Sequence, residues 1–154
     1  MKIGFIGLGS LGTPLAQNIM DSGHELSVYN RTASKAQSFA GKGAKVCASV
    51  EELAKECTVV FTMVSDDAAL KDVSAELMNH LQKGSIHISM STILPQTAAE
   101  LDAAHTQKGL HYLAAPVFGR PEAARNRKMS FVLSGNAETR KKAEPLCRDA
   151  GAIN

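Results

Sequence analysis

Short apolar runs rich in β-branched residues alternate with longer amphipathic stretches along the whole chain. The short runs predict buried strands over residues 2–6, 25–29, 44–46, 58–64, 85–88, 110–114 and 129–133. The longer stretches predict helices over 12–22, 34–40, 50–55, 68–81, 95–107 and 137–150. The first helix is expected to face the sheet with its i, i+4, i+7 and i+8 positions, Leu11, Leu15, Asn18 and Ile19. This alternation predicts an α/β fold in one domain, 1–154: a doubly wound, mostly parallel sheet with helices on both faces.

The composition is that of an ordinary globular protein. Of 154 residues, 44% are hydrophobic and 21% are charged, which argues against a disordered chain. The formal net charge of +2 is too small to indicate nucleic acid or an anionic membrane as a partner. No apolar run approaches the length of a membrane span. Three cysteines without C-x-x-C spacing indicate reduced thiols in the cytoplasm, and neither disulfides nor a zinc site: Cys47, Cys57 and Cys147.

A glycine-rich turn follows the first predicted strand. Gly7, Gly9 and Gly12 form a G-x-G-x-x-G pattern that runs directly into the first predicted helix. In that setting Gly7 permits a tight turn, Gly9 lets the backbone approach a pyrophosphate, and Gly12 permits close packing of the helix. The N-terminus of the helix adds free N–H groups and a partial positive charge. The segment therefore predicts the phosphate site of a Rossmann-type dinucleotide-binding fold rather than a turn without a ligand.

The end of the second predicted strand bears on which dinucleotide binds. An NAD site places an acid there, about 20 residues beyond the glycines, to bind the ribose 2′-OH. This chain has Asn30 at that position, followed by Arg31. A neutral amide beside a guanidinium suits a 2′-phosphate, and Thr32 and Lys35 offer a hydroxyl and a further cation. The pattern favours NADP and leaves NAD possible, while Thr32 or Ser34 is also expected to cap the next helix.

Two further strand ends are expected at the same edge of the sheet. Met63, Val64 and Ser65 end the fourth strand and should lie against the nicotinamide half of the cofactor. Asp66 and Asp67 follow, and their adjacency favours capping of a helix over paired acid–base chemistry. After the fifth strand, the hydroxyls of Ser91 and Thr92 either bind cofactor or substrate or cap the helix that begins near Pro95.

The histidines do not indicate a metal site. His87 lies within a predicted strand and is expected in the core. The other four lie at loop or helix ends without ligand spacing: His24, His80, His105 and His111.

Five segments occur in the order and spacing typical of the β-hydroxyacid dehydrogenases: GFIGLGSLGTPLAQNI, YNRT, MVSDDAAL, SMSTILPQTAAEL and YLAAPVFGRPEAA. Over essentially its whole length the chain resembles this family, which includes 3-hydroxyisobutyrate and 6-phosphogluconate dehydrogenases, glyoxylate/succinic semialdehyde reductase and, more distantly, imine reductases. The resemblance implies NAD(P)-dependent hydride transfer between a small hydroxy acid and its carbonyl form. Carried over by position, it implies cofactor contacts from Gly7, Leu8, Gly9, Ser10, Leu11, Gly12, Asn30, Arg31, Thr32, Lys35, Met63, Val64, Ser65 and Thr92.

The substrate loop departs from the family pattern. Where the family has A-P-V-S-G-G, this chain has APVFGR over residues 115–120, so Phe118 replaces the serine that would hold a substrate carboxylate. Gly119 still offers its N–H, and Arg120 is a possible carboxylate partner. Ser91 completes the expected substrate side. A bulkier or less polar substrate than the usual small hydroxy acids is expected.

The second departure concerns the proton donor. In the family, a helix beyond the nucleotide domain carries a catalytic Lys and an Asn, and an all-helical domain that forms homo-oligomers follows. No lysine of this chain lies in such a motif, and the family position of the Lys falls beyond Asn154. We therefore expect the N-terminal half of a cytoplasmic enzyme, one that binds NADP with little turnover alone. The alternatives are a non-catalytic NAD(P)-sensing module and a fold for flavin or S-adenosylmethionine; Arg31 argues against those two ligands, which bring no 2′-phosphate.

Overall fold

The computed structural model describes residues 2–153, in which six parallel strands form the central sheet. The sheet has the order β3-β2-β1-β4-β5-β6, and β1 pairs in register with both β2 and β4. The chain therefore winds outward from β1 in both directions, which confirms the doubly wound α/β fold. In chain order the strands are β1 (Lys2–Ile6), β2 (Glu25–Tyr29), β3 (Lys45–Val46), β4 (Val59–Thr62), β5 (Ile86–Ser89) and β6 (His111–Ala114).

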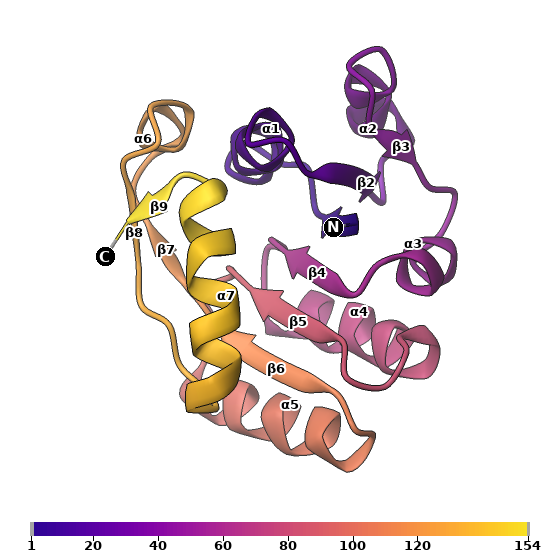
Figure 1. Ribbon diagram of the computed structural model, residues 1–154, viewed down its shortest axis with the longest axis vertical. Helices are drawn as coiled ribbons and strands as arrows, with labels where there is room; N and C mark the ends of the chain where they lie inside the picture. The colour runs from indigo at the N-terminus through magenta and orange to yellow at the C-terminus, as the bar shows by residue number, and fades with distance from the viewer. Residues whose placement is uncertain (1, 154) are drawn as a thin grey trace.

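Helices cover both faces of this sheet (Figure 1). Successive strand residues point to opposite faces, so Phe5 belongs to one apolar core and Ile6 to the other. On the first face, α1 (Gly12–Asp21), α2 (Ala33–Ala40) and α7 (Ala137–Asp149) pack around the stacked rings of Phe5 and Phe61, 5.9 Å apart. On the second face lie α3 (Val50–Glu56), α4 (Asp67–His80) and α5 (Pro95–Gln107).

A second, small sheet corrects the predicted placement of residues 129–133. The strand there is β8 (Met129–Phe131), and it belongs to a three-stranded sheet with β7 (Val117–Phe118) and β9 (Ala152–Ile153). β8 runs antiparallel to β7 and parallel to β9, and a short helix, α6 (Pro121–Arg125), joins β7 to β8. Neither β7 nor α6 was predicted. Figure 1 shows this sheet beyond the arrowheads of β5 and β6, at the carboxyl edge of the main sheet.

The side chain of Asn18 in α1 connects the central sheet to the small three-stranded sheet and its helices. Its side chain was expected to face the central sheet, but its amide donates to the carbonyls of Ala124 (2.8 Å) and Ala150 (3.0 Å) instead. The guanidinium of Arg127 adds hydrogen bonds to the carbonyls of Asn18 (2.9 Å) and Asp149 (3.2 Å). Two side chains thereby donate to carbonyls at the ends of α1, α6 and α7, and the two bonds from Asn18 are buried, where an unpaired carbonyl would cost free energy.

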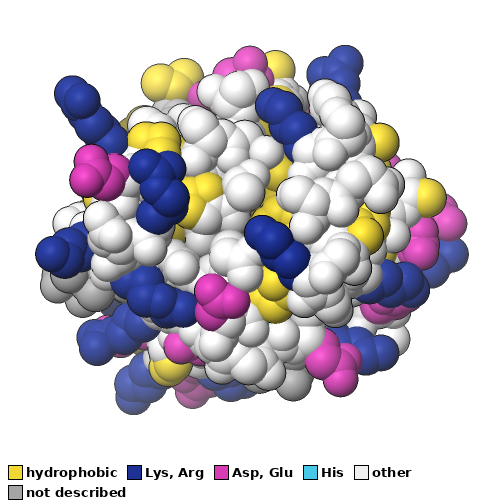
Figure 2. Space-filling model, turned by 90° about the horizontal axis from the view of Figure 1, so that it is seen from above, with side chains coloured by type: hydrophobic (Ala, Val, Ile, Leu, Met, Phe, Trp, Pro, Cys, Tyr) yellow, Lys and Arg dark blue, Asp and Glu magenta, His cyan; other side chains and the backbone are white. Residues whose placement is uncertain are grey.

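The surface carries no single dominant charge. In Figure 2, basic side chains are distributed around the visible face with acidic ones among them. Within residues 2–153, no helix has both the length and the apolar character needed to cross a bilayer.

Cys57 lies in the core as predicted, and all three thiols are buried and free.

Candidate functional site

A cleft of about 520 Å³ opens at the carboxyl ends of β1, β2 and β4, where the strand order reverses. Sheets of this kind bind ligands at that position. The cleft brings together nine of the predicted cofactor residues: Gly7, Gly9, Asn30, Arg31, Thr32, Lys35, Met63, Val64 and Ser65.

The glycine turn lies at the base of the cleft, and a side chain is disfavoured at each of its three glycines for a different reason. Gly7 has a φ of +101°, and a Cβ there would lie 2.0 Å from the carbonyl oxygen of Met63. A Cβ at Gly12 would lie 1.8 Å from the carbonyl oxygen of Gly7, so this glycine lets α1 approach the turn itself. A Cβ at Gly9 would meet nothing within 4 Å. Two glycines are therefore required by the fold, and the third leaves open space where a pyrophosphate would bind.

Asn30 connects the glycine turn to the turn after β2. Its Oδ1 accepts a hydrogen bond from the N–H of Leu8 (2.8 Å), and its Nδ2 donates to the carbonyl of Thr32 (2.9 Å). Leu8 itself is buried in the core, with its N–H already bound. Both residues were predicted to contact cofactor. The structure gives Asn30 a positioning role and Leu8 a packing role in addition to any contact with a ligand.

The cationic end of the cleft is exposed. Arg31, Thr32 and Lys35 are solvent-accessible, and among residues 2–153 neither cation forms an ion pair. Thr32 occupies the N-cap position of α2 but makes no capping bond with its side chain, and Ser34 lies within the helix, so the predicted capping by Thr32 or Ser34 is wrong. A hydroxyl and two cations are therefore available to an anionic group.

The turns after β4 and β5 are tied to each other. The Ser91 hydroxyl is buried and accepts a hydrogen bond from the N–H of Val64 (2.9 Å). Asp66 caps α4 as predicted, since its Oδ1 accepts from the N–H of Ala69 (2.8 Å). The N-cap residue of α5 is Leu94, so the capping alternative for Ser91 and Thr92 is wrong. Ser91 thus holds the turn, while Thr92 is exposed beside it and does not line the cleft.

One wall of the cleft was missed by sequence reasoning. α4 contributes residues at i, i+3, i+4 and i+7 from Ala69, a spacing that places them on one helical face. The face carries two carboxylates, and the helical period alone was enough to find it once the helix was placed after the "MVSDD" turn. The added lining residues are Ile6, Tyr29, Val50, Ala69, Asp72, Val73 and Glu76.

The predicted substrate residues lie outside the cleft, on β7 and the turn that follows. Phe118 is 52% exposed although it is a large apolar side chain. Gly119 has a φ of +141°, and Arg120 is exposed immediately before α6. β7 lies beyond the carboxyl ends of β5 and β6 (Figure 1), and none of these three residues lines the cleft.

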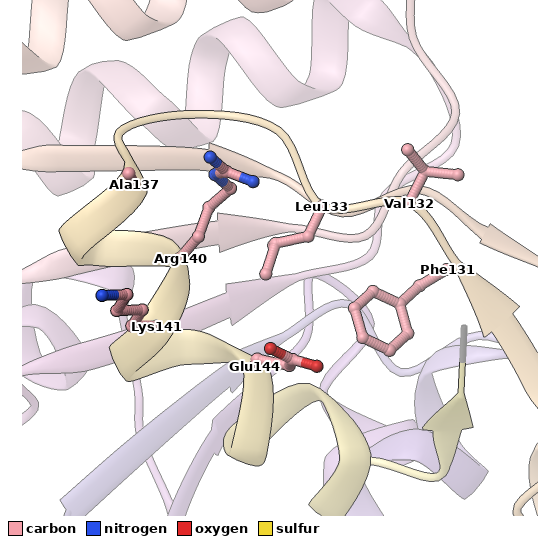
Figure 3. A pocket seen from close by; sticks show the side chains of 7 residues that line it. All are labelled: Phe131, Val132, Leu133, Ala137, Arg140, Lys141 and Glu144. Atoms are coloured by element: carbon pink, nitrogen blue, oxygen red, sulfur yellow. The ribbon is translucent and has the colours of Figure 1, made fainter.

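A second hollow, of about 420 Å³, lies between α7 and the segment that follows β8. Figure 3 shows Phe131 and Leu133 directed toward α7, with Val132 pointing away. Arg140 and Glu144 form the opposite side, and Arg140 donates to the carbonyl of Gly135 (3.1 Å). None of the predicted cofactor or substrate residues lines this hollow.

His87 is fully buried as predicted, and His105, expected at a helix end, is buried beside it. The Leu101 carbonyl can only accept, so His105 donates to it through Nδ1 (2.6 Å) and accepts at Nε2 from Nδ1 of His87 (3.1 Å). Thr62 then donates to Nε2 of His87 (2.8 Å). Burial holds the pKa of His87 well below its ordinary value and also lowers that of His105. Among residues 2–153, no cluster of potential metal ligands is found.

Comparison with known proteins agrees with this geometry. The sequence model described as the NAD binding domain of 6-phosphogluconate dehydrogenase matches residues 2–154. An uncharacterized oxidoreductase of Bacillus subtilis, YfjR, is 42% identical over 95% of this chain and 52% of its own length. The chain thus spans about half the length of this relative.

Two solved structures share the fold almost throughout. The 3-hydroxyisobutyrate dehydrogenase of Mycobacterium tuberculosis, solved with L-serine, superposes with a TM-score of 0.93 at 27% identity, covering 99% of this chain and 53% of its own. Psf3, in complex with NADP+ and 2-OPP, superposes with a TM-score of 0.91 at 30% identity, covering 98% of this chain and 55% of its own. Together with the glycine turn and the cleft, these matches confirm the resemblance seen in the sequence. The chain belongs to the 6-phosphogluconate dehydrogenase family, as its NAD(P)-binding domain.

Proposed function

We propose that this chain is the cofactor-binding half of an NADP-dependent oxidoreductase of the β-hydroxyacid dehydrogenase type. The observation that carries the preference for NADP is the cationic end of the cleft. Arg31 and Lys35 stand beside the neutral Asn30, where an NAD site has an acid. The acids of the cleft belong to α4 rather than to this turn. A 2′-phosphate would therefore meet a guanidinium, an ammonium and the hydroxyl of Thr32 without an adjacent carboxylate.

The residues present suit the remaining parts of the cofactor. The open backbone at Gly9 and the N-terminus of α1 would hold the pyrophosphate. Met63, Val64 and Ser65, with Thr92 beyond them, would lie along the nicotinamide half. When bound, the cofactor supplies or accepts the hydride; this chain binds and orients it.

The substrate is proposed to be a small hydroxy acid or carbonyl compound with an apolar portion. Arg120 and the N–H of Gly119 would bind its carboxylate, and the exposed ring of Phe118 would contact its apolar part. Ser91 enters this proposal as the residue that holds the neighbouring turn, because its hydroxyl is bound to Val64.

The whole protein is proposed to add a helical second domain that carries the proton donor and forms a homo-oligomer in the cytoplasm. The chain alone is then expected to bind NADPH with little turnover. The two relatives described above as an oxidoreductase and a 3-hydroxyisobutyrate dehydrogenase favour an enzyme over a cofactor-sensing module.

Fluorescence titration with NADPH and NADH tests the proposal. Arg31→Asp should weaken NADPH binding by about 10- to 100-fold, the range expected for hydrogen bonds to a charged group, and leave NADH within about threefold. Lys83→Asp makes the same charge change just before β5, at the opposite edge of the sheet, and should alter neither affinity. Equal NADPH affinity in wild type and Arg31→Asp would refute the assignment.

A further inference from the structure

The turn after β5 is held in place by a carboxylate from a different helix. Asp67, in the first turn of α4, accepts two hydrogen bonds at its Oδ2, from the N–H of Leu94 (3.1 Å) and from the hydroxyl of Thr97 (2.6 Å). Both donors lie at the start of α5. Asp67 lies in the first turn of α4 as predicted, and its side chain also reaches the start of α5, through contacts with residues 27 and 30 positions away.

This contact satisfies a need that the sequence of α5 leaves open. The N-cap residue of α5 is Leu94, whose side chain cannot accept a hydrogen bond. A negative charge near the N-terminus of α5 also favours the helix dipole. Hydrogen bonds from Thr97 and then from Leu94 hold the pKa of Asp67 below its ordinary value, so the carboxylate stays charged at neutral pH.

The segment 91–94 is therefore fixed at both ends by the turn that follows β4. At its start the Ser91 hydroxyl accepts from the N–H of Val64, and at its end the N–H of Leu94 donates to Asp67. Val64 lines the cleft, whereas Thr92 is exposed between the two fixed points. Any movement of segment 91–94 is thus limited relative to the wall of the cleft.

The strand order says which part of a dinucleotide this segment would meet. The cations that suit a 2′-phosphate follow β2, and the order across the sheet is β2, β1, β4, β5. A dinucleotide with its adenosine end at β2 and its pyrophosphate at the β1 turn extends toward β4 and β5 with its nicotinamide half. Segment 91–94 lies at that far end.

We propose that Asp67 is a positioning residue for the nicotinamide half of the cofactor, acting through segment 91–94 without touching the cofactor. The proposal rests on the proposed NADP function. A change at Asp67 should therefore affect binding of the nicotinamide half alone, because binding of the adenosine end depends on Arg31, Thr32 and Lys35.

Titration calorimetry with NADPH and with adenosine 2′,5′-bisphosphate tests this separation. Asp67→Ala removes both hydrogen bonds and should weaken NADPH binding about three- to tenfold, while the bisphosphate stays within about twofold. Asp67→Asn keeps an acceptor oxygen for both donors and should restore most of the NADPH affinity. Asp102→Ala removes an exposed carboxylate of α5 that has no side-chain hydrogen bond within residues 2–153, and should change neither ligand.

Hydrogen exchange measures the same contact without a ligand. The Leu94 amide should exchange faster in Asp67→Ala and at the wild-type rate in Asp67→Asn. Equal weakening of both ligands by Asp67→Ala, unchanged NADPH affinity, or failure of Asp67→Asn to restore it would overturn the inference. A wild-type chain that binds the bisphosphate but gains nothing from the nicotinamide half also overturns it, whereas one that binds neither ligand refutes the proposed function and the inference with it.

Discussion

The buried histidine pair is expected to make stability depend on pH in the weakly acidic range. His87 and His105 are held neutral by burial, and their four ring nitrogens already have assigned roles in the chain from Thr62 to the Leu101 carbonyl. A proton added at Nε2 of His105 would face the Nδ1–H of His87, so the chain accommodates no further proton there. In the unfolded chain both imidazoles are free to take up a proton with an ordinary pKa of about 6.5.

The difference in histidine pKa between the folded and unfolded states sets the sign and the size of the change in stability with pH. Because the folded pKa of each histidine is lowered, the unfolded state binds more protons below about pH 6.5, and stability falls as the pH falls. Between about pH 7.5 and about pH 5.5, one histidine that stays neutral in the folded state costs about 1.4 kcal/mol. With His105 contributing up to a similar amount, the melting temperature should fall by about 3 to 11 °C.

Thermal unfolding followed by circular dichroism at a series of pH values provides the measurement. His87→Gln should be less stable at neutral pH but should lose less on acidification, by about the contribution of one histidine. His111→Gln removes an exposed histidine and should leave the slope close to that of wild type. A wild-type melting temperature that is constant or rises on acidification, or the same slope in His87→Gln, would contradict the reasoning.

Three other substitutions or reagents test separate features. Gly12→Ala places a Cβ 1.8 Å from the carbonyl oxygen of Gly7, and should cost about 1–3 kcal/mol in urea unfolding and weaken dinucleotide binding. Asn18→Ala removes a buried donor from the carbonyls of Ala124 and Ala150, of which Ala124 keeps the backbone N–H of Arg127 (3.2 Å), and should cost about 1–3 kcal/mol in the same assay, with no smaller loss in Asn18→Leu. Burial raises the pKa of the thiols of Cys47 and Cys57 to about 11 and that of Cys147 to about 12. These thiols should therefore resist iodoacetamide in the native chain at mildly alkaline pH and react after denaturation.

Local pattern was enough for the central sheet because each buried strand is a β-branched run next to a helix with its own period. The strands β1 and β2 have the predicted bounds, and the helices α5 and α7 begin at the predicted residues. The glycine turn could also be predicted from the sequence. A Cβ at Gly12 would clash with Gly7, a few residues back along the chain, and a Cβ at Gly7 would clash with Met63, directly after the adjacent strand β4. The two-residue strand β7 was missed because it has no measurable period and forms only by pairing with β8.

Side-chain partners distant in sequence account for the other errors. Asn18 reads as one polar position on an apolar helical face, and its partners lie 106 and 132 residues away. Asp67 was predicted only to cap α4 together with Asp66. Its bond to α5 was missed, because the sequence does not show that the N–H of Leu94 needs an acceptor. Asn30 was predicted from its spacing to contact the cofactor, and this stays a prediction; its bond to the N–H of Leu8 was missed because it depends on the pairing of β1 with β2.

Taken together, these distant bonds have a common consequence for binding. Asn30 joins the turns after β1 and β2, while Ser91 and Asp67 join the turns after β4 and β5. Each bond links two loops that a dinucleotide would otherwise have to order on arrival, and ordering loops weakens affinity. The two pairs are connected in turn by Gly7, whose missing Cβ lets the first turn lie against the Met63 carbonyl of the third. The turns after these four strands therefore behave as one preformed surface, and a substitution in any of these bonds should act on affinity more than on the identity of the nucleotide bound, which we propose depends on Arg31.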